Sequence, residues 1–175
     1  MRCLRLLPAL TLVLLLPLAA ACGGGPPNEP TFAQGVKSET DGVAAALLPD
    51  IVLSTGTSLD TMPAGFASCG GHNWRYQADG DLLVVQPTGI QPSQDSIVEA
   101  VTNAMDDQGL TVTVQDDGTV LGRRAALSVS VGPAEGPEGA MSQHVTFLND
   151  CTGYFDADQD FAENTPELDY AGFVG

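Results

Sequence analysis

The sequence predicts an α+β fold: an antiparallel sheet of four to five strands with two helices on one face and one disulfide. Alternating apolar residues and turn dipeptides lie on both sides of one clear amphipathic helix, a segregation typical of such sheets. The segment 38–155 has a length that suits one domain. It contains Cys69 and Cys151, which can pair in only one way.

The first helix is expected to begin at Ser38, a residue that can cap it. Pro49 is expected to end it, because the residue before a proline disfavours helical geometry. Its apolar face is predicted to consist of Val43, Ala44, Leu47 and Leu48. Residues 50–53 fit either a strand or a continuation of this helix.

Two strands, 74–77 and 82–85, are expected next, joined by a turn at Asp79-Gly80. The second helix is capped by Ser93 or Asp95, and Gly109 stands where a left-handed C-cap is expected. Its apolar stripe is predicted to contain Ile97, Val98, Val101, Ala104 and Met105.

A meander is expected to complete the sheet. Residues 111–114 alternate into Asp117-Gly118, a strong hairpin signal, and 127–131 alternate again. Residues 132–139 contain too much proline and glycine for a regular element, so we expect a loop there. A last strand is expected to run from Val145 toward Cys151.

The first 22 residues have the organisation of an export signal. Two arginines precede an apolar stretch, Leu6–Leu18, and three alanines precede Cys22. A retained membrane span is disfavoured because the stretch is shorter than the roughly 20 residues that a span needs. It also contains Pro8 and Pro17.

The sequence Ala19-Ala20-Ala21-Cys22 resembles the lipobox of bacterial lipoproteins, Leu-(Ala/Ser)-(Gly/Ala)-Cys, with alanine where leucine is usual. The resemblance implies that residues 1–21 are a signal peptide and that Cys22 carries the lipid. The three alanines also form a site for ordinary signal peptidase, which would release a soluble protein. Residues 22–37, rich in glycine and proline, are the expected flexible tether.

Two acyl chains, palmitate among them, are sufficient for stable membrane anchoring. We therefore expect the protein to be anchored on the extracytoplasmic side of the cell membrane. The plan of residues 1–155 resembles that of small actinobacterial lipoproteins of unassigned function: a lipobox, a tether, two helices and a meander between two cysteines. A single lysine, Lys37, in a chain rich in alanine, glycine, aspartate and valine is typical of a GC-rich genome. The resemblance implies no catalytic residues.

Outside the cytoplasm, a disulfide between Cys69 and Cys151 is the expected state of these thiols. Chain-entropy arguments value such a bridge at roughly 4 kcal/mol. The alternative is a reactive or metal-binding Cys69 beside His72, but no further cysteine or histidine stands at ligand spacing nearby.

The formal net charge is −16, from 6 basic and 22 acidic residues. Cleavage would remove Arg2 and Arg5, leaving 4 basic against the 22 acidic residues, a net charge of −18. Such a chain is repelled by nucleic acids and anionic lipid heads, so neither is an expected partner. Cationic partners and metal ions remain open.

The acidic C-terminal tail, 156–175, offers one candidate metal site. Its possible calcium ligands, at the spacing of an EF-hand loop, are Asp156, Asp158, Asp160 and Glu167. Phe161 occupies the position of the turn glycine, and no flanking helix pair is evident. The alternative is a solvated acidic tail. The tail aromatics, Phe161, Tyr170 and Phe173, fit either docking onto the sheet or a mobile tail.

Three arginines, Arg75, Arg123 and Arg124, could bind an anionic ligand or pair with acidic residues. Trp74 and Tyr76, on the same predicted strand as Arg75, could line a cleft or the core.

Ser68, Cys69 and His72 lie close together, but neither a residue that orients the base nor an oxyanion site can be identified. His144 is expected at an exposed sheet position, and contact of His72, Asp81 or His144 within a polar cleft would favour an enzyme.

No cofactor is expected. The leading hypothesis is a monomeric, lipid-anchored envelope accessory or binding module with an unknown envelope protein or ligand as partner. The alternatives are an envelope enzyme and calcium-dependent binding through the tail.

Overall fold

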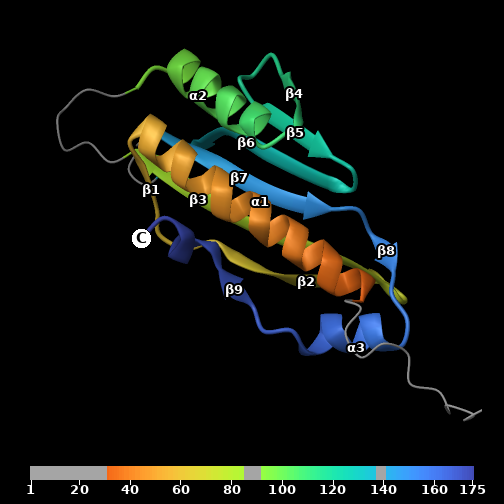
Figure 1. The fold of residues 1–175 in the computed structure, drawn as a ribbon. Helices are drawn as coiled ribbons and strands as arrows, with labels where there is room; N and C mark the ends of the chain where they lie inside the picture. Colours follow the sequence, from red (N-terminus) through yellow and green to blue (C-terminus); the bar gives the residue numbers. More distant parts are fainter. Residues whose placement is uncertain (1–30, 85–91, 137–140) are drawn as a thin grey trace, which may run out of the picture.

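The computed structural model describes residues 31–84, 92–136 and 141–175, and these form one antiparallel sheet with helices packed on one face (Figure 1). The predicted α+β class is confirmed. The described residues make nine strands, more than the four to five expected, because the sequence did not predict strands at 63–70 and 120–124 and because three short strands of two or three residues extend the sheet.

The main path of the sheet runs β4-β5-β6-β7-β3-β2-β9. β3 (Asn73–Val84) also pairs with two short strands, β1 (Thr57–Leu59) and β8 (Thr152–Gly153). The other strands are β2 (Pro63–Gly70), β4 (Thr111–Val114), β5 (Val120–Arg124), β6 (Leu127–Glu135), β7 (Met141–Asn149) and β9 (Leu168–Asp169).

Helix α1 (Phe32–Thr55) lies over the sheet, nearly along the direction of β3 and β7, and is much longer than predicted (Figure 1). It begins with a capping box of Thr31 and Gln34, so 32–37, expected in the tether, are helical. It also continues through Pro49, which was expected to end it. Ile51, fully buried beyond the proline, contributes about 1.5–3 kcal/mol that helps offset a break costing ~3 kcal/mol.

Helix α2 (Gln94–Asp107) lies beside α1 on the same face of the sheet (Figure 1). Of the two expected N-caps, Ser93 is the actual one, because its hydroxyl accepts a hydrogen bond from the Ser96 backbone N–H at 3.1 Å. Gly109 has a φ of +71°, which confirms the predicted left-handed position after the helix. Four of the five stripe residues are buried: Ile97, Val101, Ala104 and Met105.

The predicted turn at Asp79-Gly80 is wrong, because β3 continues through it as a single strand. A glycine is needed at position 80 because residues Thr61 and Met62 pass close to the β3 backbone there. A Cβ on Gly80 would lie 2.8 Å from the Thr61 carbonyl oxygen and 3.0 Å from the Met62 side chain. A glycine inside a predicted strand can therefore indicate the close approach of another part of the chain, and not only a turn. The β4–β5 hairpin does turn at the predicted Asp117-Gly118.

The expected loop 132–139 is in part a strand, since β6 extends to Glu135. Pro133 pairs with Gln143 of β7. On the other side of β6, the first residue of β5, Val120, pairs with Val131, so β5 does not reach Pro133. The missing N–H of Pro133 therefore falls where β6 has a neighbour on one side only, the setting in which a strand tolerates proline. Residues 137–140 lie outside the described part.

The core lies between the helices and the sheet. Along β7, Val145 and Phe147 are buried against the helices, whereas His144 and Leu148 point to the opposite, exposed face. Buried residues from all layers form the main cluster, including Leu47, Leu48 and Ile51 of α1, Ile97 and Val101 of α2, and Leu82, Val129 and Tyr76 of the sheet.

The C-terminal segment 156–175, whose docking or mobility the sequence leaves open, is folded onto the domain. It forms helix α3 (Ala157–Asn164), strand β9 and a short 3₁₀ helix, η2 (Tyr170–Phe173). Tyr170 is fully buried in the main core. Asp169 accepts hydrogen bonds from the backbone N–H groups of Met62 and Ala171, at 2.8 and 3.0 Å, and these lower the pKa of its carboxyl.

Candidate ligand groove between α1 and α2

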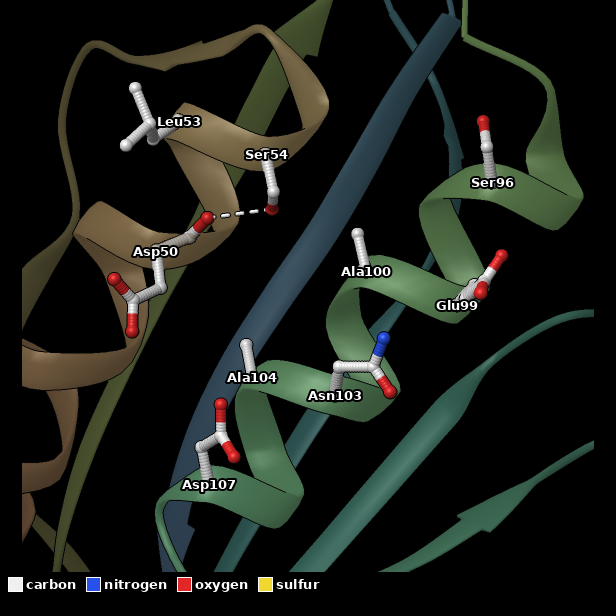
Figure 2. Close-up of a pocket in the computed structure, with 9 residues that line it drawn as sticks. All are labelled: Asp50, Leu53, Ser54, Ser96, Glu99, Ala100, Asn103, Ala104 and Asp107. Atoms are coloured by element: carbon white, nitrogen blue, oxygen red, sulfur yellow. Dashed lines mark hydrogen bonds between the residues drawn. The ribbon is translucent and has the colours of Figure 1, made fainter.

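A groove of about 630 Å³ lies between the C-terminal half of α1 and the length of α2 (Figure 2). Its volume is within the range typical of ligand sites, about 300–1,000 Å³. α2 contributes one continuous face at helical spacing, and α1 contributes one turn. The lining residues are Asp50, Leu53, Ser54, Ser96, Glu99, Ala100, Asn103, Ala104 and Asp107.

The groove is acidic. It contains three carboxylates, Asp50, Glu99 and Asp107, and no lysine, arginine or histidine. None of the three carboxylates takes part in an ion pair within the described residues. The negative charge of this surface is therefore left to solvent or to a ligand.

The helix ends add to this charge. Asp107 is the last residue of α2, and neither α1 nor α2 has a basic residue in its last turn. The C-terminus of a helix carries about half a negative charge, so a carboxylate there costs stability, typically about 0.3–1 kcal/mol. The placement of Asp107 therefore opposes helix stability.

The groove has a small apolar component. Leu53 stands at its rim with 86% of its surface exposed, the most exposed large hydrophobic side chain in the described residues. Ala100 and Ala104 lie on the α2 side facing α1 (Figure 2). The hydroxyls of Ser54 and Ser96 are already bonded to backbone carbonyls of their own helices.

A second polar arrangement, the Asp41 network, consists of Lys37, Asp41, Tyr76 and Tyr170. Oδ1 of Asp41 accepts hydrogen bonds from the hydroxyls of Tyr76, at 2.9 Å, and Tyr170, at 2.6 Å. Its Oδ2 pairs with the ammonium of Lys37, which also lies 5.4 Å above the Tyr76 ring. Burial, followed by the effect of Asp41, raises the pKa of both phenols. Sequence analysis did not identify this network. The available signal was the four-residue spacing of Lys37 and Asp41, which places both on one face of a helix.

The predicted disulfide is present: Cys69 and Cys151 are bonded, with 6.3 Å between their Cα atoms. It joins β2 to the segment between β7 and β8. Cys22, the expected lipidation site, lies outside the described residues, as do the signal peptide and most of the expected tether.

The candidate calcium ligands are not brought together. Asp158 and Asp160 belong to helix α3 and Asp156 precedes it, whereas Glu167 lies beyond the helix beside Gly65. Asp158 is engaged elsewhere, since its carboxylate accepts the Ala33 backbone N–H at 2.7 Å. Among the described residues, no group of three or more acidic, histidine or cysteine side chains could hold a metal ion.

The three candidate arginines do not form a cluster. Arg124 bonds to Glu39 at 3.2 Å and to the Gln108 carbonyl at 2.9 Å, which ties β5 to both helices. Arg75 and Arg123 form no ion pair with any described carboxylate. They lie on β3 and β5, two strands separated in the sheet by β6 and β7.

The aromatic pair on β3 belongs to the interior. Tyr76 is in the main core, and Trp74 packs against a second cluster that contains Ala33, Tyr154 and Ala162. The Trp74 indole nitrogen is buried and has no hydrogen-bond partner among the described residues.

The two histidines lie in separate places. His144 Nδ1 is 2.8 Å from Asp81 on the exposed face of the sheet, where the two side chains are 47% and 58% exposed. His72 bonds to Gln159 at 3.0 Å near the disulfide. Neither histidine bonds to a hydroxyl or thiol in the described part of the chain.

Comparison with known proteins adds no assignment to this geometry. No protein-family model matches the chain, and neither curated proteins nor solved structures show a significant match. Within residues 31–84, 92–136 and 141–175, no helix has the length and apolar character to cross a membrane.

Proposed function

We propose that the protein is a lipid-anchored binding module of the cell envelope, held on the extracytoplasmic side of the membrane through Cys22. The groove between α1 and α2 is its binding surface. The observation that carries the binding role is the set of three groove carboxylates without a basic partner among the described residues. The three carboxylates are exposed and carry like charge, so a cationic ligand would reduce their mutual repulsion.

Two further features support export and anchoring. The Cys69–Cys151 bond is of the kind that persists in oxidising compartments. The lipobox-like Ala20-Ala21-Cys22 stands nine residues before Thr31, the N-cap of α1. From there, α1 carries the chain roughly 30 Å to the groove, at about 1.5 Å per residue. The groove therefore lies at the end of α1 away from the segment that carries Cys22, a position that suits contact with a neighbouring envelope protein.

The anchoring half of the proposal is tested by metabolic labelling with a palmitate analogue in intact cells. We expect label in the wild-type chain and none in Cys22→Ala, which should also leave the membrane fraction. Absence of label from the wild type would contradict the anchor.

The binding half is tested by site-specific photo-crosslinking in the same cells. A crosslinking amino acid replaces Asn103 in the groove or, as a matched control, Thr146 on the exposed face of the sheet. We expect a discrete adduct from position 103 and none from position 146. Equal adducts from both positions, or none from position 103, would contradict the groove as the binding surface.

A further inference from the structure

We infer that the ligand of the α1–α2 groove is an amphipathic cationic helix of about three turns, supplied by another protein. This inference rests on the proposed function and specifies the chemistry of the partner. Three properties of the groove support it: the nature of its walls, its length and its charge.

The walls favour a helical ligand over an extended one. Both are α-helices, whose interior backbone N–H and C=O groups are already hydrogen-bonded. An extended peptide gains affinity by adding to the free edge of a sheet, and the groove offers no such edge. A helix satisfies its own backbone groups and needs only side-chain contacts, as in other helix-in-groove complexes.

The length follows from α2. Its groove-facing residues run from Ser96 to Asp107 at helical spacing, a distance of roughly 16 Å at about 1.5 Å per residue. A ligand helix lying along this face therefore makes contact over about three turns. The small side chains of Ala100 and Ala104 allow its backbone to approach closely, near the lower end of the usual interaxial range of about 8–10 Å.

The apolar part of the ligand is set by Leu53. Because 86% of this side chain is exposed at the groove rim, it is positioned to contact a leucine-like residue on the ligand. Contact with a second apolar side chain would remove this surface from water, which favours binding.

The charge of the ligand is set by Asp50, Glu99 and Asp107. Glu99 and Asp107 lie eight positions apart on one face of α2, about two turns, with Asn103 on the turn between them. Lysine or arginine side chains along the edges of the ligand helix would complement them. Charge pairs at an exposed groove are screened by salt, so affinity should fall as ionic strength rises.

The test uses calorimetry with the full chain bearing Cys22→Ser, so that no acyl group competes for the peptide. The probe is a synthetic 14-residue peptide of leucine, alanine and lysine that forms an amphipathic helix. A scrambled peptide of the same composition, a version with glutamate in place of lysine, and spermidine serve as comparisons. We expect micromolar binding of the amphipathic cationic peptide alone, weakened at least tenfold when salt rises from 50 to 500 mM.

Two sets of variants locate the site. Asp50→Asn, Glu99→Gln and Asp107→Asn combined, and separately Leu53→Ser, should each weaken binding at least tenfold. The matched control combines Asp60→Asn, Asp79→Asn and Asp150→Asn, which removes the same charge from exposed positions outside the groove. It should change the affinity less than twofold.

The inference is overturned by equal binding of the scrambled peptide, by equal effects of the two triple variants, or by spermidine binding as tightly as the peptide. The last result would identify a small organic cation as the ligand. Absence of binding by every probe would also overturn it. In that case a groove-specific crosslink in cells would still support the proposed function, so the two failures are distinguishable.

Discussion

The two halves of α1 carry acidic side chains in opposite circumstances. In the N-terminal half, Asp41 is enclosed by one ammonium and two phenolic hydroxyls. In the C-terminal half, Asp50 lies in the groove with two further carboxylates and no cation. A charge that is fully paired inside the fold stabilises it, whereas charges that the fold leaves unpaired are free to serve binding.

The C-terminal segment makes this contrast possible. Tyr170 reaches Asp41 from 129 positions further along the chain. Its ring packs against Phe147 and Phe173, with centroids 5.9 and 5.0 Å away. The segment therefore completes the Asp41 network, and its α3 and η2 pack against α1. The groove has no corresponding cover in the described part of the chain.

The largest effect is expected from Asp41→Ala. The substitution leaves the hydroxyls of Tyr76 and Tyr170 and the ammonium of Lys37 without their shared acceptor. Hydrogen bonds to a charged group contribute about 1.5–3 kcal/mol each, so we expect a loss of about 3 kcal/mol in the free energy of unfolding. Urea unfolding with the disulfide intact measures it.

The matched control is Asp50→Ala, on the same helix but in the groove. We expect it to change the free energy of unfolding by less than about 0.5 kcal/mol, as is usual for surface positions. Similar losses from both substitutions would remove the distinction between the two halves of α1.

A smaller effect is expected from Tyr170→Phe, which keeps the buried ring and removes its hydrogen bond to Asp41. We expect a loss of about 1.5 kcal/mol at neutral pH. Because burial and Asp41 raise the pKa of this phenol in the folded state, its contribution is present below the unfolded pKa of about 10 and is lost as the pH rises above it.

The phenylalanine variant should therefore lose stability less steeply than the wild type between pH 10 and 11. Each such group changes the slope by up to about 1.4 kcal/mol per pH unit. Urea unfolding at pH 8, 10 and 11 measures the slopes. Identical slopes for the two proteins would show that Tyr170 does not govern the alkaline response.

Local signals were sufficient for several elements. The stripe and caps of α2, the turn at Asp117-Gly118 and the pairing of the two cysteines each depend on residues close together or on a unique choice. In each case the local preference agrees with the packing that the fold requires. Such agreement is what allows sequence patterns to predict structure.

Elements decided by distant contacts could not be predicted in this way. Pro49 indicates a helix end locally, but the burial of Ile51 against the sheet keeps α1 intact. Tyr170 lies in an acidic segment for which the sequence leaves docking and mobility open, and its contact with Asp41 becomes visible only in the fold. The groove likewise requires the relative placement of two helices, which no sequence spacing specifies.

The smallest effect on stability, and one of opposite sign, is expected from neutralising the groove. Asp50→Asn, Glu99→Gln and Asp107→Asn combined remove mutual repulsion and an unfavourable charge at the C-terminus of α2. We expect a gain of up to about 1 kcal/mol in the free energy of unfolding at low salt, which shrinks as salt screens the charges. Thermal and urea unfolding at 20 and 500 mM salt measure it. A loss greater than about 0.5 kcal/mol would mean that these carboxylates hold the fold together, as Asp41 does, and would remove the reason for assigning the groove to a cationic ligand.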